Sequence, residues 1–482
     1  MSFSASHIVP APREQVWEWH TRKGALARIT PPFVPMTPLQ QAGRLSDGTT
    51  VLGFPAGLRW TARHDLSRYR KGYAFSDVCV NAPMRVLANW RHDHHFEDHA
   101  EGTLVTDTVE TRVPKSVMET MFAYRQHQLI EDIALLNRLK GLGYVDGLAD
   151  SSSIYGASRP LKIAMTGSRG AVGRTLTAQL SLAGHEVVQL VRGKVKPGQR
   201  HWNPVAPASD LLDGIDVLVH LAGEPIFGRF NDSHKKDIRD SRVGPTRKLA
   251  EIVAKSETVT TMVSASAIGY YGNDRGEELL TESSEPGDGF LADVCVDWEA
   301  ATAPASEAGK RVVTMRTGVV ISGNSGVLPL FKALFSTGLG GTFGDGEFWL
   351  SWIGADDLTD MYTHAILEEK LSGPINAVAP NPVLNRGLAQ AIGTEMKRPS
   401  VIPIPTFGPA LLLGKEGARE LALADQRVIP EVLNNHDHHF RYPTIDKALA
   451  HELGREKLWA PAEPDASEST ASGDDEPLTK DN

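Results

Sequence analysis

The chain has 482 residues, of which 41% are hydrophobic and 23% charged, a composition typical of a globular protein with two to four domains. The formal net charge is −9, and residues 461–482 hold seven acidic residues against one lysine, so we expect an acidic disordered tail behind a nearly neutral body. This balance does not favour nucleic-acid binding. The sequence has neither an apolar run long enough to span a membrane nor a secretory leader, so we expect a cytoplasmic protein. Cys79 and Cys295 are the only cysteines, which excludes a disulfide scaffold or a cysteine-rich metal site.

The first 145 residues predict an α+β unit. A strand is predicted over 3–9, a helix over 13–29, and extended runs over 50–54, 58–64, 73–80, 85–96 and 103–113. A long helix closes the unit, with apolar residues near helical spacing at Val117, Met121, Tyr124, Leu129, Ile133 and Leu136. This order predicts a curved antiparallel sheet that grips the last helix and leaves a cavity under its concave face.

A Ser/Gly-rich run over 146–160 predicts a linker to a second, longer segment. In that segment strands alternate with helices. Strands are predicted over 162–165, 186–191, 216–221, 261–265 and 311–321, with a helix over 173–183. Right-handed crossovers between these strands would build an α/β fold with a doubly wound parallel sheet of the Rossmann type.

The turn after the first of these strands has a glycine pattern typical of dinucleotide binding. It consists of Thr166, Gly167, Ser168, Arg169, Gly170, Ala171, Val172 and Gly173, and it joins an apolar strand to an amphipathic helix. Gly167 allows a sharp turn, Gly170 lets backbone amides approach a pyrophosphate, and Gly173 lets the helix pack closely on the sheet. The helix N-terminus adds a positive dipole. All eight residues are candidate cofactor ligands, and the alternative is a tight strand–helix turn without a ligand.

The end of the second strand indicates which dinucleotide binds. A carboxylate at this point would hold the ribose 2′-OH of NAD, but here the strand VVQLV is followed by Arg192. An arginine can make charge-assisted bonds to a 2′-phosphate, and Arg169 would add a second contact. We therefore predict NADP as the cofactor; the alternative is that Arg192 is a solvated charge at a strand end.

From Leu161 to about Gly454 the chain resembles the extended short-chain dehydrogenase/reductases, and more closely an atypical epimerase-family subgroup described as sugar-nucleotide-epimerase-like. The matching motifs are MTGSRGAVG (165–173), HLAGEPI (220–226), SASAIGYYG (264–272), GDGFLADVCVDWE (287–299), MRTGVVIS (315–322), SWIGADDL (351–358) and NAVAPNPV (376–383). A further run, RVIPEVLNNHDHHFRYPTIDKAL (427–449), is similar to the small C-terminal domain that accompanies this subgroup.

This resemblance implies further site residues. Leu221, Ala222 and Gly223 would lie along the cofactor at the end of the fourth strand. Ser264 and Ser266 would end the fifth strand beside the nicotinamide, and the alternative for either hydroxyl is that it caps a turn.

The first segment resembles helix-grip domains of the START/Bet v 1-like superfamily (SRPBCC), which implies a hydrophobic ligand in its cavity. The resemblance lies in VPAPREQVWEWHTRKGALARITPP and WRHDHHFEDHAEGTLVTDTVETRVP. The predicted division is a helix-grip domain over 1–145, a linker over 146–160, an NADP-binding Rossmann domain over 161–400, a small C-terminal domain over 401–458 and a disordered tail over 459–482.

The chemistry that the superfamily uses is incomplete in this chain. Reduction or epimerisation there requires a tyrosine with a lysine four residues later, and none of the nine tyrosines has one. Where the pair would fall, the chain has Leu291 and Cys295. Tyr271 is our substitute catalytic candidate together with Ser264 and Ser266.

Two neighbours of these candidates are kept as weaker alternatives. Tyr270 shares the loop with Tyr271, and Arg275 lies near it in sequence. Asp293, Asp297 and Glu299 fall at helical spacings but are expected to face solvent.

Two functions remain open from the sequence. The first is an NADP-dependent oxidoreductase or nucleotide-sugar-epimerase-like enzyme with a small or hydrophobic substrate. The second is a non-catalytic NADP(H) sensor or assembly protein with a hydrophobic-ligand module. Both need the same glycine loop, and the sequence fixes neither the substrate nor the oligomeric state.

Two histidine-rich runs suggest metal binding, but we predict no metal site. His92, His94, His95 and His99 lie in one run, and His436, His438 and His439 in another. In the first run His92 and His94 alternate with Asp93 and His95, as on the two faces of a strand, so its histidines are expected to line the rim of the cavity.

Overall fold

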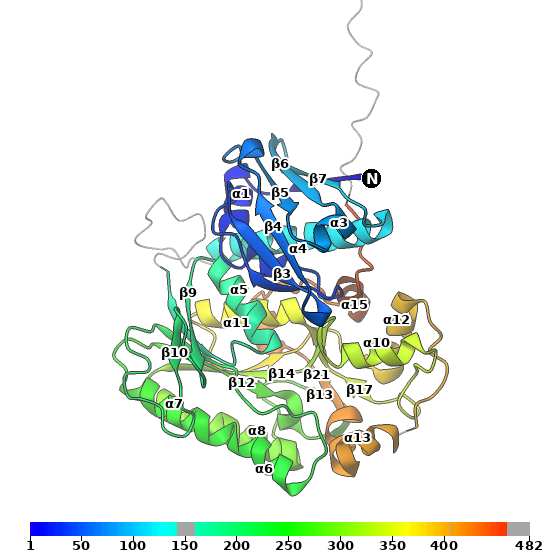
Figure 1. Ribbon diagram of the computed structural model, residues 1–482. Helices are drawn as coiled ribbons and strands as arrows, with labels where there is room; N and C mark the ends of the chain where they lie inside the picture. Colours follow the sequence, from blue (N-terminus) through cyan, green and yellow to red (C-terminus); the bar gives the residue numbers. More distant parts are fainter. Residues whose placement is uncertain (142–159, 406, 460–482) are drawn as a thin grey trace, which may run out of the picture.

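The computed structural model describes residues 1–141, 160–405 and 407–459. The predicted tail, beyond residue 459, and the predicted linker, up to residue 159, lie outside these ranges. The N-terminal part rests on a larger α/β part, with α5 (Ala171–Leu182) and α11 (Ala355–Leu367) facing it (Figure 1). Within the described ranges, no helix combines the length and apolarity needed to cross a membrane.

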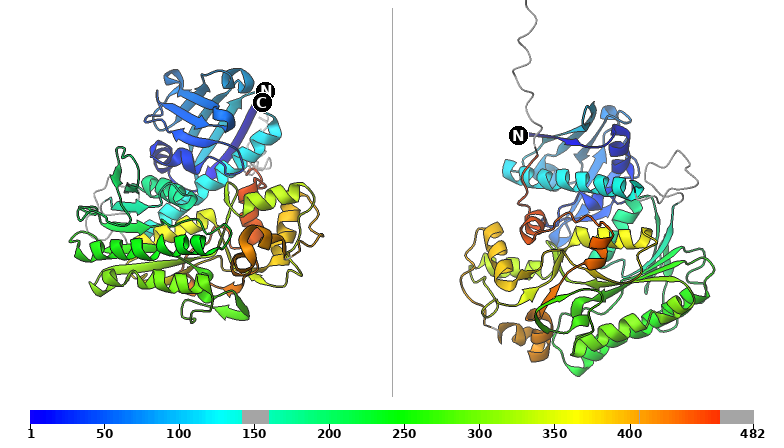
Figure 2. Two further views of the ribbon diagram at one scale, coloured as in Figure 1. Left: turned by 60° about the horizontal axis from the view of Figure 1, so that its bottom comes forward. Right: turned by 180° about the vertical axis from the view of Figure 1, so that it is seen from behind.

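The N-terminal part contains an antiparallel sheet with the strand order β1-β7-β6-β5-β4-β3-β2. Its strands are β1 (Ser2–Val9), β2 (Thr37–Gln40), β3 (Thr49–Gly53), β4 (Arg59–His64), β5 (Ala74–Cys79), β6 (Arg91–His99) and β7 (Gly102–Glu110). The long helix α4 (Lys115–Gly141) lies between this sheet and the rest of the molecule (Figure 2). The predicted helix-grip arrangement is therefore present.

Two local predictions for this part were wrong, and one strand was missed. The helix expected over 13–29 is two helices, α1 (Arg13–Thr21) and α2 (Ala25–Arg28), separated by Gly24 at φ +100°. A β-carbon on Gly24 would lie 2.1 Å from the carbonyl oxygen of Ala178 in α5, so the break allows a close contact between distant segments. The strand expected over 85–96 begins only at Arg91, after the short helix α3 (Met84–Ala88). Strand β2 was not predicted.

The larger part is built on a parallel sheet with the order β10-β9-β8-β11-β12-β14-β19. The strands are β8 (Lys162–Thr166), β9 (Glu186–Val191), β10 (Gln199–His201), β11 (Val217–His220), β12 (Thr261–Ala267), β14 (Arg311–Thr317) and β19 (Gly373–Ala377). The order reverses direction at β8, next to β11, and this is the topological switch point at which such sheets bind ligands. The predicted doubly wound Rossmann fold is confirmed.

Side chains of the buried strands alternate between two helix layers. Ile163 and Met165 of β8 belong to the core cluster that includes residues of α5 and α11, whereas Ala164 belongs to the cluster of α7 (Val243–Lys255). Helices α6 (Asp232–Asp240), α8 (Phe290–Ala300) and α9 (Ala303–Glu307) complete the layer around α7. Both faces of the sheet are therefore covered, as a parallel sheet requires.

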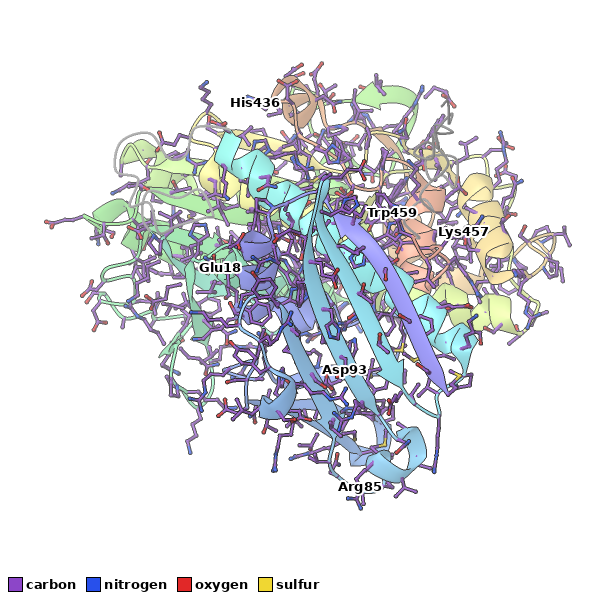
Figure 3. All side chains as sticks on the ribbon, turned by 90° about the horizontal axis from the view of Figure 1, so that it is seen from above. Glu18, Arg85, Asp93, His436, Lys457 and Trp459 are labelled. Carbon is purple, nitrogen blue, oxygen red and sulfur yellow. The ribbon has the colours of Figure 1, made fainter. Side chains whose placement is uncertain are left out.

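The remaining elements lie in the segments that follow β12, β14 and β19 along the chain. Short strand pairs join β13 (Asp274–Leu280) to β21 (Asp425–Val428), β15 (Val319–Ser322) to β16 (Ser325–Gly326) and β18 (Trp352–Gly354), and β17 (Trp349–Leu350) to β20 (Val383–Leu384). The helices here are α10 (Leu328–Ser336), α12 (Asn385–Met396), α13 (Phe407–Gly417), α14 (Glu431–Asn435) and α15 (Ile445–Leu453). After α15 the chain returns to α4, where the backbone N–H of Trp459 donates to Gln126 at 2.8 Å (Figure 3).

A buried network of ion pairs joins the two parts. Arg28 of α2 donates to Asp132 of α4 at 2.6 Å and pairs with Asp356 of α11 at 2.5 Å. Arg441, which follows α14, pairs with the same Asp132 at 2.9 Å and makes two bonds to Asp360 of α11, at 2.6 and 2.7 Å. All five side chains are at least nine-tenths buried. Each guanidinium therefore bridges α4 and α11 in a region from which water is excluded.

Replacement of Asp132 tests the contribution of this network. Asp132→Asn leaves Arg28 and Arg441 with one carboxylate fewer in a buried site, so we expect the free energy of unfolding to fall by about 3–5 kcal/mol. Asp240→Asn removes the exposed pair with Lys236 and serves as the matched control, with little or no expected loss because solvent screens this pair. Urea unfolding of both variants measures the difference; equal losses would contradict a structural role for the network.

The network also predicts a loss of stability at alkaline pH. Burial alone would lower the pKa of His451, but the carboxylates of Glu456 and Asp356 outweigh burial and raise it from 6.5 to about 10. The resulting stabilisation is complete below pH about 6.5 and is lost as the pH rises through about 10. We expect the Tm of the wild type to fall more steeply between pH 7 and 10 than that of His451→Gln, as followed by calorimetry. Parallel curves would show that His451 is not charged in the folded protein.

Candidate functional site

The glycine loop lies between β8 and the N-terminus of α5, at the switch point of the sheet. Gly170 is the N-cap residue of α5, and the first turn of this helix contains no acidic residue that would offset its positive dipole. Arg169 and Gly170 are exposed, Ala171 and Val172 are half-buried, and the Ser168 side chain is buried. The loop thus presents an uncompensated helix N-terminus next to exposed backbone, and it fits the pyrophosphate of a dinucleotide.

Two of the glycines are required by close backbone contacts. Gly167 has φ +67°, and a β-carbon there would lie 2.7 Å from the backbone of Leu221. At Gly173 a β-carbon would lie 2.3 Å from the carbonyl oxygen of Gly167. These contacts bring the loop, the start of α5 and the end of β11 together, which is the role predicted for both residues.

Thr166 holds the next segment of the candidate site in place. It is fully buried, and its hydroxyl lies 2.7 Å from Nδ1 of His220 and accepts from the backbone N–H groups of Leu221 and Ala222 at 3.1 and 3.2 Å. Burial lowers the pKa of His220 to about 4, so this ring is neutral. Thr166 therefore positions the segment after β11 instead of presenting its own hydroxyl to a ligand.

Gly223 and Arg192 complete the cofactor candidates. A β-carbon on Gly223 would lie 3.0 to 3.3 Å from the guanidinium of Arg242, which donates to the carbonyl oxygen of Glu224 at 2.9 Å. Arg192 directly follows β9 and is exposed, as is Arg169 across the switch point. Both guanidinium groups are therefore exposed. Arg169 belongs to the glycine turn, and Arg192 lies on the loop that follows β9.

The predicted catalytic hydroxyls belong to a buried hydrogen-bond network. Ser266 donates to Glu299 at 2.6 Å, and Arg316 of β14 makes two bonds to the same carboxylate, each at 2.9 Å. Ser264 is fully buried and donates to the carbonyl oxygen of Ala265 at 3.2 Å. Glu299 was expected to face solvent, but it is the acceptor that holds Ser266 and Arg316 together. The signal that sequence reasoning missed is an acid on α8 opposite an arginine on β14.

Tyr271 lies in the same network, where it is fully buried. Its hydroxyl is bonded to Asn376 at 2.6 Å, to the carbonyl oxygen of Thr281 at 2.9 Å and to Arg316 at 2.9 Å. Burial outweighs the effect of Arg316 and raises the pKa of Tyr271 to about 12. These contacts are typical of a structural tyrosine and do not favour the predicted catalytic role.

The neighbouring Tyr270 differs from Tyr271. It is half-buried, the Arg316 guanidinium lies 3.5 Å from its ring centroid, and its hydroxyl makes no hydrogen bond to any residue in the described ranges. At the positions where the usual pair would fall, Leu291 is buried, and burial raises the pKa of the Cys295 thiol to about 12. Arg275 makes two bonds to Glu278, at 2.7 and 2.8 Å.

The N-terminal part contains a separate cavity of about 550 Å³. It lies between the concave face of the sheet, α2 and α4, and its wall is mostly apolar, with residues such as Leu26, Ile29, Met36, Leu52, Phe75 and Met121. Polar side chains gather in one part of this wall: His64, Asp77, His92 and His94 from the sheet, His20 from α1 and Arg125 from α4. The cavity therefore has the volume and wall for a mainly apolar ligand with a polar end.

Several polar side chains of the cavity are buried, and burial shifts their pKa values. Burial lowers the pKa of His20 to about 3 and that of His94 to about 4, and it also lowers the pKa of His92. Burial alone would raise the pKa of Asp107, but the adjacent His94 and His92 hold it well below its usual range. Burial thus favours the neutral form of His20 and His94, while the two adjacent rings favour the ionised form of Asp107.

Comparison with known proteins agrees with this architecture. Residues 163–377 match the NAD dependent epimerase/dehydratase family, residues 9–133 the polyketide cyclase/dehydrase and lipid transport family, and residues 404–452 a domain of unknown function, DUF1731. An epimerase family protein of Mycobacterium bovis is 39% identical over 297 residues, which cover 61% of this chain and 98% of the relative.

Two solved structures are also similar. A crystal structure described as a nucleoside-diphosphate sugar epimerase from Corynebacterium glutamicum is 57% identical, with a TM-score of 0.82, and the match covers 95% of this chain and 91% of that one. The human epimerase family protein SDR39U1, solved with NADPH, is 29% identical with a TM-score of 0.56 over 61% of this chain and 99% of its own.

The fold and the glycine loop define an NAD(P)-binding protein of the short-chain dehydrogenase/reductase class. Within that class the chain belongs to the NAD-dependent epimerase/dehydratase family, and it carries a START/Bet v 1-like helix-grip domain at its N-terminus.

Replacement of Gly167 tests the geometry of the loop. Gly167→Ala places a methyl group against the backbone of Leu221 at a positive φ, so we expect the loop to shift and dinucleotide affinity to fall at least tenfold. Gly193→Ala is the matched control, because a β-carbon there meets no atom within 4 Å and affinity should not change. NADPH fluorescence titration measures both, and unchanged affinity in Gly167→Ala would contradict the site.

Proposed function

We propose that this protein binds NADP(H) at the glycine loop and transfers hydride between this cofactor and a carbonyl or ring carbon of a small or hydrophobic substrate. The observation that carries the cofactor assignment is Arg192 at the end of β9, where no carboxylate is present to hold a ribose 2′-OH. The human relative that was solved with NADPH supports the same choice.

Each candidate residue has a role in this proposal. The backbone from Gly167 to Gly173 and the N-terminus of α5 would hold the pyrophosphate, and Arg192 with Arg169 would hold the 2′-phosphate. Thr166 positions Leu221, Ala222 and Gly223 along the dinucleotide through the hydrogen bonds described above. When bound, the nicotinamide supplies or accepts the hydride.

The proton that accompanies hydride transfer needs a donor from this chain. Ser266 and Tyr271 were predicted for this task, but their hydroxyls are held by Glu299 and Asn376. Tyr270, on the same loop, is a better candidate because its hydroxyl is not held within the described ranges and it is half-buried.

The second candidate function is a non-catalytic NADP(H)-binding sensor or assembly protein with a hydrophobic-ligand module. The absence of the tyrosine–lysine pair from the sequence, together with the three hydrogen bonds that fix Tyr271, favours this alternative. Hydride transfer and sensing both require the same cofactor preference, so turnover on carbonyl substrates separates them.

Cofactor titration tests the assignment to NADP(H). We expect the wild type to bind NADPH more tightly than NADH, and Arg192→Asp to weaken NADPH binding by about 1–3 kcal/mol through the loss of charge-assisted bonds. NADH affinity should stay the same or rise, since an aspartate can accept from a ribose 2′-OH. The same reversal at the exposed Arg44 in the N-terminal part should leave both affinities unchanged. Equal affinity of the wild type for the two dinucleotides would contradict the proposal.

A further inference from the structure

Four polar side chains of neighbouring strands gather at one corner of the N-terminal cavity, and three of them line it. Asp77 of β5 lies opposite His92 of β6 in the sheet register, and His94, two residues further along β6, lies opposite Asp107 of β7. Residues that are paired or two apart along a strand share a face of the sheet. Three adjacent strands therefore bring two imidazoles and two carboxylates together on the concave face.

Asp107 contacts both rings through one oxygen atom. Its Oδ1 lies 2.8 Å from Nε2 of His92 and 2.8 Å from Nδ1 of His94. These contacts turn the other nitrogen of each ring away from Asp107. These are Nδ1 of His92 and Nε2 of His94.

Both of these nitrogens face the same carboxylate oxygen. Nδ1 of His92 lies 3.7 Å from Oδ2 of Asp77, and Nε2 of His94 lies 3.9 Å from it, which is too long for hydrogen bonds. The ligand atoms of the three residues all lie within 4.8 Å of one another. Two ring nitrogens and one carboxylate oxygen thus converge on one part of the cavity wall, an arrangement that can hold a metal ion.

We propose that Asp77, His92 and His94 bind a divalent transition-metal ion at the wall of the N-terminal cavity. Zinc–nitrogen bonds of about 2.0–2.1 Å in tetrahedral geometry place ligand atoms roughly 3.3 Å apart. The distances of 3.7 and 3.9 Å from the two histidines to Asp77 exceed this spacing, so the three side chains would draw together around a bound ion. Two imidazoles and one carboxylate suit Zn²⁺ or Fe²⁺ rather than Mg²⁺ or Ca²⁺.

Asp107 supports this site by contacting both histidine ligands, although it is not itself a proposed metal ligand. A carboxylate that accepts from the second nitrogen of a metal-bound histidine is the usual support of such sites, and here one carboxylate supports both rings.

The position of the site gives the metal a role in ligand binding. Its three ligands all line the cavity, so the coordination positions that they leave free face the enclosed space. An apolar ligand with an oxygen donor at one end would place its body against Leu26, Ile29 and Phe75 and its oxygen on the metal. The site takes no part in dinucleotide binding, so it stands independently of the function proposed above.

The expectation of no metal site came from the alternation of the run HDHHF. Alternation does separate His92 and His94 from Asp93 and His95, and Asp93 pairs with Arg68 at 2.7 Å. The same alternation places the side chains of His92 and His94 together on the concave face of the sheet. The third ligand, Asp77, comes from another strand and cannot be found by spacing within the run.

Cobalt titration of the full chain tests the proposal. After treatment with a chelator, the wild type should bind one Co²⁺ per chain with the visible absorption of a nitrogen- and oxygen-ligated ion, and Zn²⁺ should displace it. Asp77→Asn and His92→Gln should abolish the absorption. Asp107→Asn should weaken binding about 10- to 100-fold, because it removes the support of both rings. His95→Gln is the matched control, since His95 lies on the same strand but is exposed.

These outcomes distinguish a metal site from a metal-free cluster of hydrogen-bonded side chains. If the wild type binds no Co²⁺, or binds it equally well in Asp77→Asn and His92→Gln, the proposal is wrong and these groups form a metal-free polar cluster. Near-UV circular dichroism of each variant shows whether the N-terminal part is folded. The wild-type titration decides the question even if both ligand variants fail to fold.

Discussion

The arrangement of this molecule depends on the buried ion pairs that α11 makes with the N-terminal part. Asp356 and Asp360 lie one turn apart on α11, and each binds an arginine that also binds Asp132 of α4. A buried charge without its partner is costly, so these side chains favour the docked arrangement over any in which the two parts separate. The helix-grip domain and the doubly wound sheet are therefore held in one geometry by electrostatics in a dry interface, although each has its own apolar core.

The sequence reveals those features whose cause is local. The alternation of apolar strands and helices predicted the parallel sheet, and the glycines of the loop were predicted because a sharp turn and a close helix each require the absence of a β-carbon. The break at Gly24 could not be predicted in this way, because its cause is the backbone of Ala178, more than 150 positions away. Strand β2 and the start of β6 were likewise missed, since edge strands and short helices follow contacts more than periodicity.

The candidate chemistry was harder to predict because it depends on contacts between distant strands and helices. Ser266, Glu299, Arg316 and Tyr271 come from β12, α8, β14 and the loop after β12, and their spacing in the sequence carries no sign that they meet. Once they meet, the hydroxyls that looked available are already bonded. A hydroxyl residue at a strand end is thus weak evidence for catalysis until its hydrogen bonds are known. A glycine at a strand–helix turn is stronger evidence, because it predicts a backbone turn that can approach a phosphate group.

The short helix α2 contacts both the N-terminal cavity and the helix that follows the glycine loop. Its Leu26 lines the N-terminal cavity, its Arg28 enters the ion-pair network, and Gly24 just before it packs on the backbone of α5, the helix whose N-terminus belongs to the dinucleotide site. A displacement of α2 by a ligand in the cavity would have to move Arg28 against two buried carboxylates or move α5 itself. Because both alternatives are costly, the structure favours a cavity wall that stays fixed on this side.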